Sequence, residues 1–433
     1  MAPLEMPRPD SVPFSVEETY ALALDQADPL ARFRGEFILP RDAEGRPEAY
    51  FLGNSLGAMP RGAPAVVAQV LEAWQRHGVE GFGLGDAPWA TYQERFRGTL
   101  ASLAGALPTE VVTMNTLTVN LHAMLASFYR PAGGRVKVLM EAKAFPSDTY
   151  AVASHLAMRG VDPGHGIVEV APRAGETWIR TEDLLARIEA EGPALALVLL
   201  GGVNYYTGQL FDLGAVTAAG HRVGALVGID LAHAIGNVPL RLHDWNADFA
   251  VWCSYKYLNG GPGAIGGAFI HERHGGQPAA GRLAGWWGND PATRFQMRPT
   301  FEAERGAAGW QVSTPPILSM APLVASLALF EAAGFDALRR KSEQMTAYLE
   351  ALVRDQPGSA LEVLTPRDPV ARGCQLSLRL PGAGRALHEA LRAEGVVTDY
   401  REPDVVRLAP APLYNTFHEV WRAGTAIRRH TCR

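Results

Sequence analysis

A single lysine, Lys256, follows an apolar and aromatic run and precedes a glycine-rich stretch in the segment "VWCSYKYLNGGPGAIGGAFI" (251 to 270). Removing water from an ammonium group costs free energy, so lysine is rarely buried without a partner. One interpretation is that Lys256 ends a strand and points its amine to water. The other is that this amine is used in chemistry, for example in a Schiff base. This segment alone leaves both open.

A carboxylate, Asp230, ends the apolar run "ALVGID" and precedes "LAHAIGN". It could cap the next turn, or it could lie in the crevice where the carboxyl ends of strands in an open α/β sheet meet. Asp230 and Lys256 are 26 positions apart (256 − 230 = 26), which suits one strand, a connection and a neighbouring strand. Both side chains would then face the same crevice.

An acid and a lysine at one crevice are the pair that a pyridoxal-phosphate enzyme needs. The lysine binds the cofactor aldehyde, and the carboxylate keeps the pyridine nitrogen protonated. The segment "NTLTVNLHAML" (115 to 125) offers a phosphate site, because Thr116 or Thr118 could cap a helix whose free N–H groups face an anion. "EAKAFPSD" (141 to 148) places Phe145 at another strand end, where its ring could stack on the pyridine. Together these features predict a pyridoxal 5'-phosphate site.

The elements that must position these residues alternate between strand and helix from about residue 60 to 310. "ALALVLL" is a continuous apolar run, typical of a strand buried on both faces of a parallel sheet. "PAVVAQVLEAWQRHG" and "AVTAAGHRVG" have helical character. This alternation predicts an α/β fold with a large, doubly wound, mostly parallel sheet.

The pattern changes after "VSTPP", where "ARGCQLSLRL", "ALHEALRAEG" and "VVRLAP" indicate a smaller α+β domain. We therefore expect three parts. Residues 1–58 form an N-terminal arm that contributes to the small domain, residues 59–312 form the large cofactor-binding domain, and residues 313–433 form the C-terminal small domain.

Composition narrows the class of partner. The chain has 433 residues, of which 47% are hydrophobic and 20% charged, as in ordinary globular proteins of two or three domains. Its formal net charge of −5 gives no reason to expect nucleic acid or acidic membranes as partners. No run approaches the roughly 20 apolar residues that span a bilayer, and the N-terminus lacks the apolar core of a signal peptide. Three widely spaced cysteines show neither a metal-binding nor a disulfide pattern: Cys253, Cys374 and Cys432. We expect a soluble, cytoplasmic protein without a metal site.

Stretches across nearly the whole chain after residue 50 resemble the kynureninase family, which comprises fold-type I pyridoxal-phosphate enzymes of the aspartate aminotransferase superfamily. The stretches "AFPSD" and "APLYNTFHEV" are specific to that family. The matching stretches are "FLGNSLG" (51 to 57), "NTLTVNLH" (115 to 122), "EAKAFPSD" (141 to 148), "DLAHAIGN" (230 to 237), "WCSYKYLNGGPG" (252 to 263), "GWWG" (285 to 288), "VSTPPI" (312 to 317) and "RLAPAPLYNTFHEV" (407 to 420).

The resemblance implies a role for each matching residue. Lys256 resembles the Schiff-base lysine, Asp230 the partner of the pyridine nitrogen, and Tyr255 a proton donor; these three are the expected catalytic residues. Arg407 matches the arginine that binds the substrate α-carboxylate, a task suited to a guanidinium. The expected substrate-binding set also includes Asn54, Ser55 and Phe82. The expected cofactor contacts are Leu117, Thr118, Phe145, Pro146, Ser147, Asp148, Asp230, His233, Tyr255, Lys256, Trp286 and Thr314.

Three positions depart from the relatives. Gly201, in "LLGGVNYYTG", stands where relatives carry a serine near the cofactor, so one hydrogen bond is absent. Phe82 and Thr314 stand where members that act on 3-hydroxykynurenine tend to have histidine and asparagine. An apolar ring and a short hydroxyl offer less to the extra phenol, so we expect a preference for unsubstituted L-kynurenine.

The implied reaction is hydrolysis of L-kynurenine to anthranilate and L-alanine, a step of tryptophan catabolism and of the kynurenine pathway to NAD, with 3-hydroxykynurenine as a further substrate. The resemblance also implies a homodimer.

Two alternative functions have less support in the sequence. A cysteine desulfurase or selenocysteine lyase-like enzyme needs a reactive thiolate on an exposed loop, and none of the three cysteines is well placed for that. A non-catalytic Rossmann-like nucleotide-binding protein needs a G-x-G-x-x-G loop, which "FLGNSLG" lacks.

Overall fold

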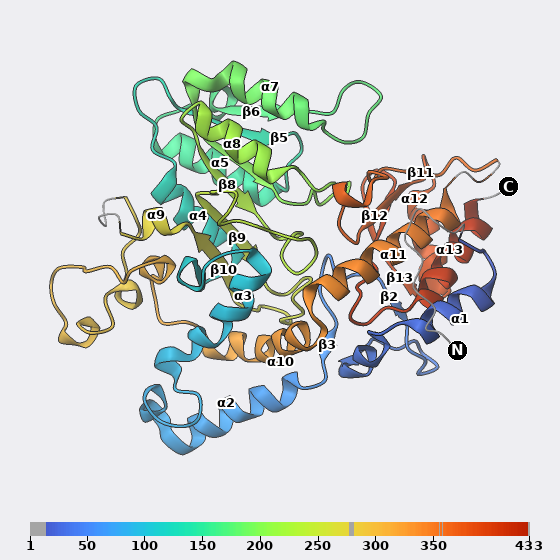
Figure 1. Ribbon diagram of the computed structural model, residues 1–433, viewed down its shortest axis with the longest axis horizontal. Coiled ribbons are helices and arrows are strands. Elements are labelled where there is room, and N and C mark those ends of the chain that lie inside the picture. Colours follow the sequence, from blue (N-terminus) through green and yellow to red (C-terminus); the bar gives the residue numbers. More distant parts are fainter. Residues whose placement is uncertain (1–13, 277–280, 355, 357, 432–433) are drawn as a thin grey trace.

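The computed structural model describes residues 14–431, except for 277–280, 355 and 357. Two sheets organise these residues, one of seven strands and one of four (Figure 1). Each sheet is covered by helices, and the larger one carries the predicted cofactor residues.

The seven-stranded sheet has the order β4-β10-β9-β8-β7-β5-β6. Neighbouring strands from β6 to β9 pair in parallel, whereas β10 runs antiparallel to both β9 and β4. This doubly wound, mostly parallel sheet confirms the predicted α/β class. Its strands are β4 (Val111–Thr113), β5 (Lys137–Glu141), β6 (Ile167–Val170), β7 (Leu195–Gly201), β8 (Leu226–Asp230), β9 (Phe249–Cys253) and β10 (Gly266–Ile270).

Two apolar cores lie on opposite faces of this sheet. Successive side chains of a strand point to opposite faces, so in β5 Val138 and Met140 join one core and Leu139 joins the other. This is why its strands are apolar without alternation. The helices of this part are α2 (Ala63–His77), α3 (Arg97–Ala104), α4 (Leu117–Phe128), α5 (Pro146–Met158), α6 (Pro163–Gly166), α7 (Thr181–Glu191), α8 (Leu213–Arg222) and α9 (Glu272–Gly275).

The smaller sheet is antiparallel, with the order β11-β12-β15-β14. The N-terminal arm packs with it, because α1 lies against α13 and β2 pairs in parallel with β13 (Figure 1). These elements are α1 (Glu18–Ala27), β2 (Ala49–Tyr50), β11 (Glu362–Val363), β12 (Leu376–Arg379), α12 (Gly384–Ala393), β13 (Val396–Val397), β14 (Asp399–Arg401), β15 (Val405–Leu408) and α13 (Phe417–Thr431). A short pair, β1 (Phe37–Ile38) with β3 (Met59–Pro60), links the arm to α2.

Helix α10 (Ile317–Ala333) packs against α2 and places Met320 and Leu323 in the core of the large sheet. Helix α11 (Phe335–Val353) belongs instead to the core of the small sheet. The expected boundary at residue 312 precedes both helices. We therefore propose that the small domain begins at Gly334, where the chain bends by 84° between them.

No single helix in the described part of the chain is long and apolar enough to cross a membrane. Only α10 and α11 taken together reach that length and composition, and they do so across the sharp bend.

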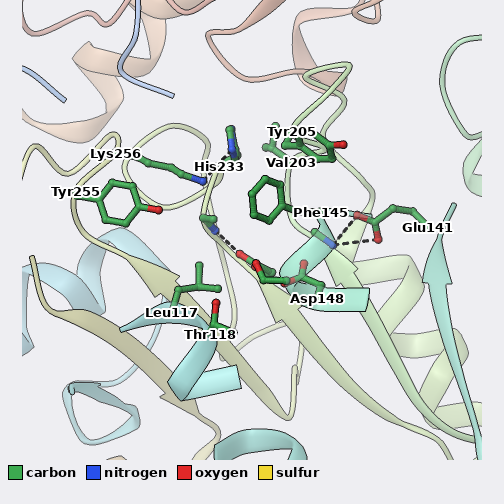
Figure 2. A pocket seen from close by; sticks show the side chains of 14 residues that line it. Leu117, Thr118, Glu141, Phe145, Asp148, Val203, Tyr205, His233, Tyr255 and Lys256 are labelled. Atoms are coloured by element: carbon green, nitrogen blue, oxygen red, sulfur yellow. Dashed lines mark hydrogen bonds between the residues drawn. The ribbon is translucent and has the colours of Figure 1, made fainter. Parts of the chain in front are cut away.

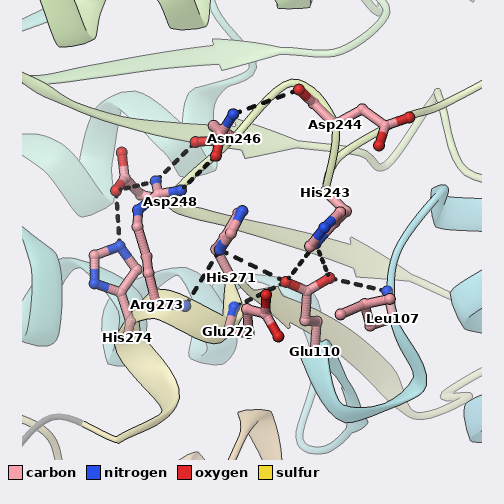
Figure 3. A network of polar contacts seen from close by, with 10 residues as sticks. All are labelled: Leu107, Glu110, His243, Asp244, Asn246, Asp248, His271, Glu272, Arg273 and His274. Atoms are coloured by element: carbon pink, nitrogen blue, oxygen red, sulfur yellow. Dashed lines mark hydrogen bonds and ion pairs between the residues drawn. The ribbon is translucent and has the colours of Figure 1, made fainter.

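A buried carboxylate, Asp248, ties together the edge of the large sheet opposite the strand ends that carry the predicted site (Figure 3). Its side chain is 1% exposed. It accepts the Val227 N–H at 2.7 Å and lies 2.9 Å from His221 Nε2, 2.8 Å from His274 Nε2 and 2.6 Å from an Arg273 nitrogen. The start of β8 is thereby joined to α8 and α9.

A second buried carboxylate, Glu110, braces the same edge (Figure 3). Glu110, His243 and His271 bring ligand-type atoms within 4.8 Å of one another, the spacing of a metal site. However, Glu110 already accepts the N–H groups of Leu107 and Glu272, and the two imidazole rings are stacked at an interplanar angle of 15°. A metal ion bound by both histidines would have to lie in both ring planes, which stacked rings do not share. We interpret the cluster as a hydrogen-bonded brace.

We predict that Asp248→Asn lowers the free energy of unfolding of the apoprotein by about 3–5 kcal/mol, because the carboxylate that it removes is buried and contacts Arg273, His221 and His274. Burial alone would raise the pKa of Asp248, but hydrogen bonds from His221, His274 and Arg273 outweigh it and hold this pKa well below its usual value. A carboxylate of lowered folded pKa stabilises the protein above its unfolded pKa of about 3.9 and loses that contribution as the pH falls towards the folded pKa. In urea unfolding, the difference from wild type should therefore be full at pH 7 and shrink below about pH 4.

The matched control is Asp244→Asn, because Asp244 lies on the same loop but is exposed. Its unfolding free energy should change by no more than about 0.5 kcal/mol. Equal losses in the two variants would contradict the bracing role of Asp248.

Candidate active site

Three neighbouring strands, β5, β7 and β8, end in Glu141, Gly201 and Asp230 at the carboxyl edge of the large sheet. The amino ends of α4 and α5 lie at the same edge, as expected for a doubly wound sheet. Together they surround a cavity (Figure 2). Its lining residues are Leu117, Thr118, Glu141, Phe145, Ser147, Asp148, Gly201, Val203, Tyr205, Asp230, Ala232, His233, Tyr255 and Lys256.

Lys256 points its amine into this cavity and not into bulk water (Figure 2). Its Nζ lies 3.1 Å from Nε2 of His233 and 5.8 Å from the centre of the Phe145 ring. His233 is 6% exposed, and burial together with the nearby charges of Lys256 and Arg407 holds its pKa well below the ordinary value. A neutral imidazole can accept a hydrogen bond from the lysine, so Lys256 is held in place without a salt bridge among the described residues.

Asp230 and Asp148 form a hydrogen-bonded carboxyl pair. Burial raises the pKa of both carboxyls. The negative charge of Asp230 raises the pKa of Asp148 further, so that it lies well above the ordinary value. Asp230 is favoured in its charged form because it accepts the Ala232 N–H at 2.6 Å and lies near Lys256. Two carboxyls this close share one proton, and we assign that proton to Asp148. The Oδ1 atom of Asp148 is buried and has no hydrogen-bond partner among the described residues, so it is open to a donor in the cavity.

The amino end of α4 leaves backbone N–H groups free. Thr116 occupies the N-cap position, but neither it nor Thr118 caps the helix: the Thr116 side chain makes no capping hydrogen bond, and Thr118 lies within the first turn. The N–H groups at Leu117 and Thr118 therefore remain available to an anion, which the helix dipole also favours there.

These features fit pyridoxal phosphate. The phosphate suits the free end of α4, and the ring nitrogen suits the Asp148–Asp230 pair with its unpartnered oxygen. One face of the ring can meet Phe145, which is 41% exposed towards the cavity, and the aldehyde can meet Lys256. Burial raises the pKa of Tyr255, so its phenol carries a proton that it can donate.

Arg407 lies next to the cavity, on β15, with its side chain 1% exposed. Its guanidinium forms a two-point ion pair with Asp399, including an Nε–Oδ1 hydrogen bond of 2.7 Å, and donates to the Tyr205 carbonyl at 2.6 Å. Ser55 donates to the same Asp399 carboxylate at 2.9 Å. Asn54, one position earlier, donates to Gln375. Gln375 in turn donates to the Tyr205 carbonyl at 3.0 Å. Arg407 thus contacts Tyr205, which lines the cavity. Ser55 contacts its counter-ion Asp399, and Asn54 is linked to it through Gln375 and the Tyr205 carbonyl.

Seven predicted residues do not line the cavity of the single chain: Arg407, Asn54 and Ser55, described above, and Phe82, Pro146, Trp286 and Thr314. Phe82 packs against Trp89, with ring centres 5.5 Å apart. Trp286 is 45% exposed and donates its indole N–H to the Arg294 carbonyl. Thr314 lies in the loop before α10. Pro146, also predicted, is the first residue of α5 between two cavity residues and does not itself line the cavity.

Four lining residues were not predicted: Glu141, Val203, Tyr205 and Ala232. Gly201 was noted only as a departure from relatives. Glu141 carries a usable signal, because it ends an apolar strand as Asp230 does. Val203 and Tyr205 carry no such signal, because the course of the loop that follows β7 is what brings them to the cavity.

Two family models match parts of the chain. Residues 161–376 match the family model described as aminotransferase class-V, and residues 338–427 match that of the kynureninase C-terminal domain. The kynureninase of Myxococcus xanthus is 52% identical over 417 residues, covering 96% of this chain and 98% of that protein. The kynureninase of Stenotrophomonas maltophilia is 53% identical over 408 residues, covering 94% and 96%. That of Flavobacterium psychrophilum is 50% identical over 413 residues, covering 95% and 97%.

Solved structures share the fold at low sequence identity. A cystine C–S lyase in complex with cysteine persulfide superposes with a TM-score of 0.73 at 20% identity, covering 88% of this chain and 97% of that one. The Escherichia coli cysteine desulfurase CsdA superposes with a TM-score of 0.72 at 17% identity, covering 92% and 98%. These two show the fold alone. The near full-length identity to several kynureninases decides the family: the chain belongs to the kynureninases.

Proposed function

We propose that the protein hydrolyses L-kynurenine to anthranilate and L-alanine, as a step of tryptophan catabolism. One observation carries this proposal: Lys256, the Asp148–Asp230 pair and the free end of α4 surround one cavity in a chain that is 52% identical to a kynureninase over 417 residues. Pyridoxal phosphate is the cofactor, and when bound it supplies an electron sink for the carbanion that forms at the substrate Cα.

The residues that would hold the cofactor follow from the geometry. Leu117 and Thr118 offer backbone N–H groups to the phosphate. Asp230 in its charged form would accept a hydrogen bond from the protonated ring nitrogen, and Asp148 in its neutral form keeps Asp230 oriented. Phe145 would cover one face of the ring. Each of these roles matches a group that the fold already buries and orients.

The chain's own residues also orient the substrate and move its protons. Arg407 would bind the α-carboxylate. Because its side chain is buried and already pairs with Asp399 and the Tyr205 carbonyl, one nitrogen of its guanidinium would turn from one of these partners to the substrate. Lys256 Nζ can take the proton from the substrate Cα. Its hydrogen-bond partner is the neutral imidazole of His233, which is not an acid that would itself donate a proton to the amine. Tyr255 holds a phenolic proton for the carbanion that remains after anthranilate leaves. Ser55 contacts Asp399, the counter-ion of Arg407, and Asn54 is linked to the Tyr205 carbonyl through Gln375. Both contacts would help to position the Arg407 guanidinium.

A desulfurase-like activity finds no support in the described cysteines. Such chemistry needs a thiolate on an exposed loop. Cys253 is buried, and burial raises its pKa. Burial also raises the pKa of Cys374, to about 12. Cys432 lies outside the described residues.

We further propose that the active form is a homodimer. Large apolar side chains stand exposed on and near α2, including Trp74 at 60% and Val79 at 81%, and such patches mark interfaces between chains. A groove beside them is lined by Val70, Trp74, Phe82, Trp89, Pro316, Ile317 and Leu318. A second copy seated there would bring Phe82, Trp286 or Thr314 towards the neighbouring cavity.

We predict that Lys256→Ala abolishes anthranilate formation, with a loss of at least about a thousandfold in kcat. In wild type, borohydride should fix the cofactor to Lys256, as peptide mapping would show. Lys143→Ala is the matched control, because Lys143 is exposed on the segment that leads to the cavity, and it should retain activity.

Anthranilate fluorescence measures the reaction, and we expect the kcat/KM for L-kynurenine to exceed that for 3-hydroxykynurenine. Bound cofactor without anthranilate would overturn the proposed substrate.

Substitutions in the Asp148–Asp230 pair test the roles of the neutral and the charged carboxyl separately. Asp148→Asn keeps a hydrogen-bond donor to Asp230, so we expect pyridoxal phosphate to bind within about tenfold of wild type. Asp230→Asn removes the charge that pairs with the ring nitrogen, and the cofactor Kd should rise by about a hundredfold, equal to roughly 2.7 kcal/mol. Titration of the apoprotein with cofactor, followed by absorbance, measures both. Equal effects would contradict the assignment of the shared proton to Asp148.

If the site is shared between subunits, Lys256→Ala and Trp286→Ala should complement each other. Each homodimer should be inactive, but random mixing makes half of the dimers heterodimers with one intact site of two, so about a quarter of wild-type activity should return. Light scattering should give twice the chain mass. A monomeric mass, or no recovery after mixing two inactive dimers, would contradict the shared site.

A further inference from the structure

Glu141 is a buried carboxyl in the cavity wall that the proposed reaction does not use. It ends β5, it is 3% exposed, and no ion pair to it occurs among the described residues. Its two carboxyl oxygens lie 3.2 and 3.3 Å from the N–H of Gly201. Burying a carboxyl with a single N–H donor costs free energy. Such a costly group at a cavity indicates a functional role.

Gly201 leaves the space into which the Glu141 carboxyl reaches. A Cβ atom at this position would lie 3.0 Å from Glu141 Oε1, tighter than ordinary van der Waals contact. Gly201 also pairs with Asp230 in the sheet, so it stands between the strand ends that carry Glu141 and Asp230. Gly201 therefore places no side chain between these two strand ends, and charges in a buried setting are weakly screened.

The charges around Glu141 come from three elements. Burial raises the pKa of Glu141 to about 7, the Gly201 N–H lowers it, and the charge of Asp230 on β8 raises it. Glu141 in turn raises the pKa of Asp148 on α5. Lys256, which follows β9, lowers the pKa of both aspartates. Glu141 is thus the outer member of a cluster of three carboxyls, and the proton balance of the inner two depends on its charge.

We propose that Glu141 is a positioning residue that acts through Asp148 and Asp230, and that its negative charge helps to keep the ring nitrogen of the bound cofactor protonated. This inference rests on the proposed function, because it requires pyridoxal phosphate at the Asp148–Asp230 pair. Glu141 need not touch the cofactor. Above about pH 7, where this carboxyl is charged, its role is to add negative potential at the Asp148–Asp230 pair.

Glu141→Gln tests the proposal, because the amide keeps an oxygen for the Gly201 N–H and removes only the charge. We expect the pH-dependent absorbance transition of the bound cofactor to move to lower pH by about one unit. The acid limb of the pH profile of kcat should move in the same direction. The matched control is Glu169→Gln, because Glu169 is an exposed carboxylate on β6 of the same sheet, and its transition should stay at the wild-type pH.

Glu141→Asp keeps the charge but withdraws it by one methylene, so its transition should fall between those of wild type and Glu141→Gln. If the glutamine variant does not fold by circular dichroism, the aspartate variant decides. A transition that stays at the wild-type pH in the folded variant would overturn the proposal. A wild-type protein that binds no pyridoxal phosphate would instead overturn the proposed function, so the two failures are distinguishable.

Discussion

The site depends on burying several ionisable groups at one edge of a parallel sheet. The same cavity that Lys256 lines is also lined by Glu141, Asp148 and Asp230. In such surroundings an isolated charge costs free energy. The structure reduces this cost in two ways. Asp148 and Asp230 share a proton, and backbone N–H groups of Ala232 and Gly201 donate to the carboxyls. A cofactor with a protonated ring nitrogen would supply the remaining positive charge, so the site is electrostatically prepared for it.

The rest of the large domain keeps these strand ends in place. Apolar cores on both faces hold β5, β7 and β8 side by side, and the network around Asp248 and Glu110 secures the opposite edge. A site built on strand ends gains precision from such rigid support, because a small displacement changes both proton sharing and substrate orientation.

A chain of side-chain contacts joins the small sheet to the proposed active site. Arg407 comes from the small sheet, and its Nη1 atom donates to the carbonyl of Tyr205 in a loop that follows β7. The ring of Tyr205 in turn lies edge-to-face against Phe145, with centres 5.2 Å apart. The arginine expected to bind the carboxylate and the aromatic ring expected to cover the cofactor are therefore linked by one residue. Movement between the domains would alter both together.

The sequence by itself determined the class of fold and the main chemistry of the site, because both follow local rules. Apolar strands alternating with helices predicted the parallel sheet, and polar residues at strand ends, Asp230 and Lys256, predicted where the crevice lies. Only the tertiary structure decided what depends on distant segments. It brought Tyr205 against Arg407, set Glu141 across Gly201 from Asp230, and left Phe82, Trp286 and Thr314 outside the cavity of one chain. Loop paths and strand register fix those relations, and neither leaves a periodic pattern in the residues themselves.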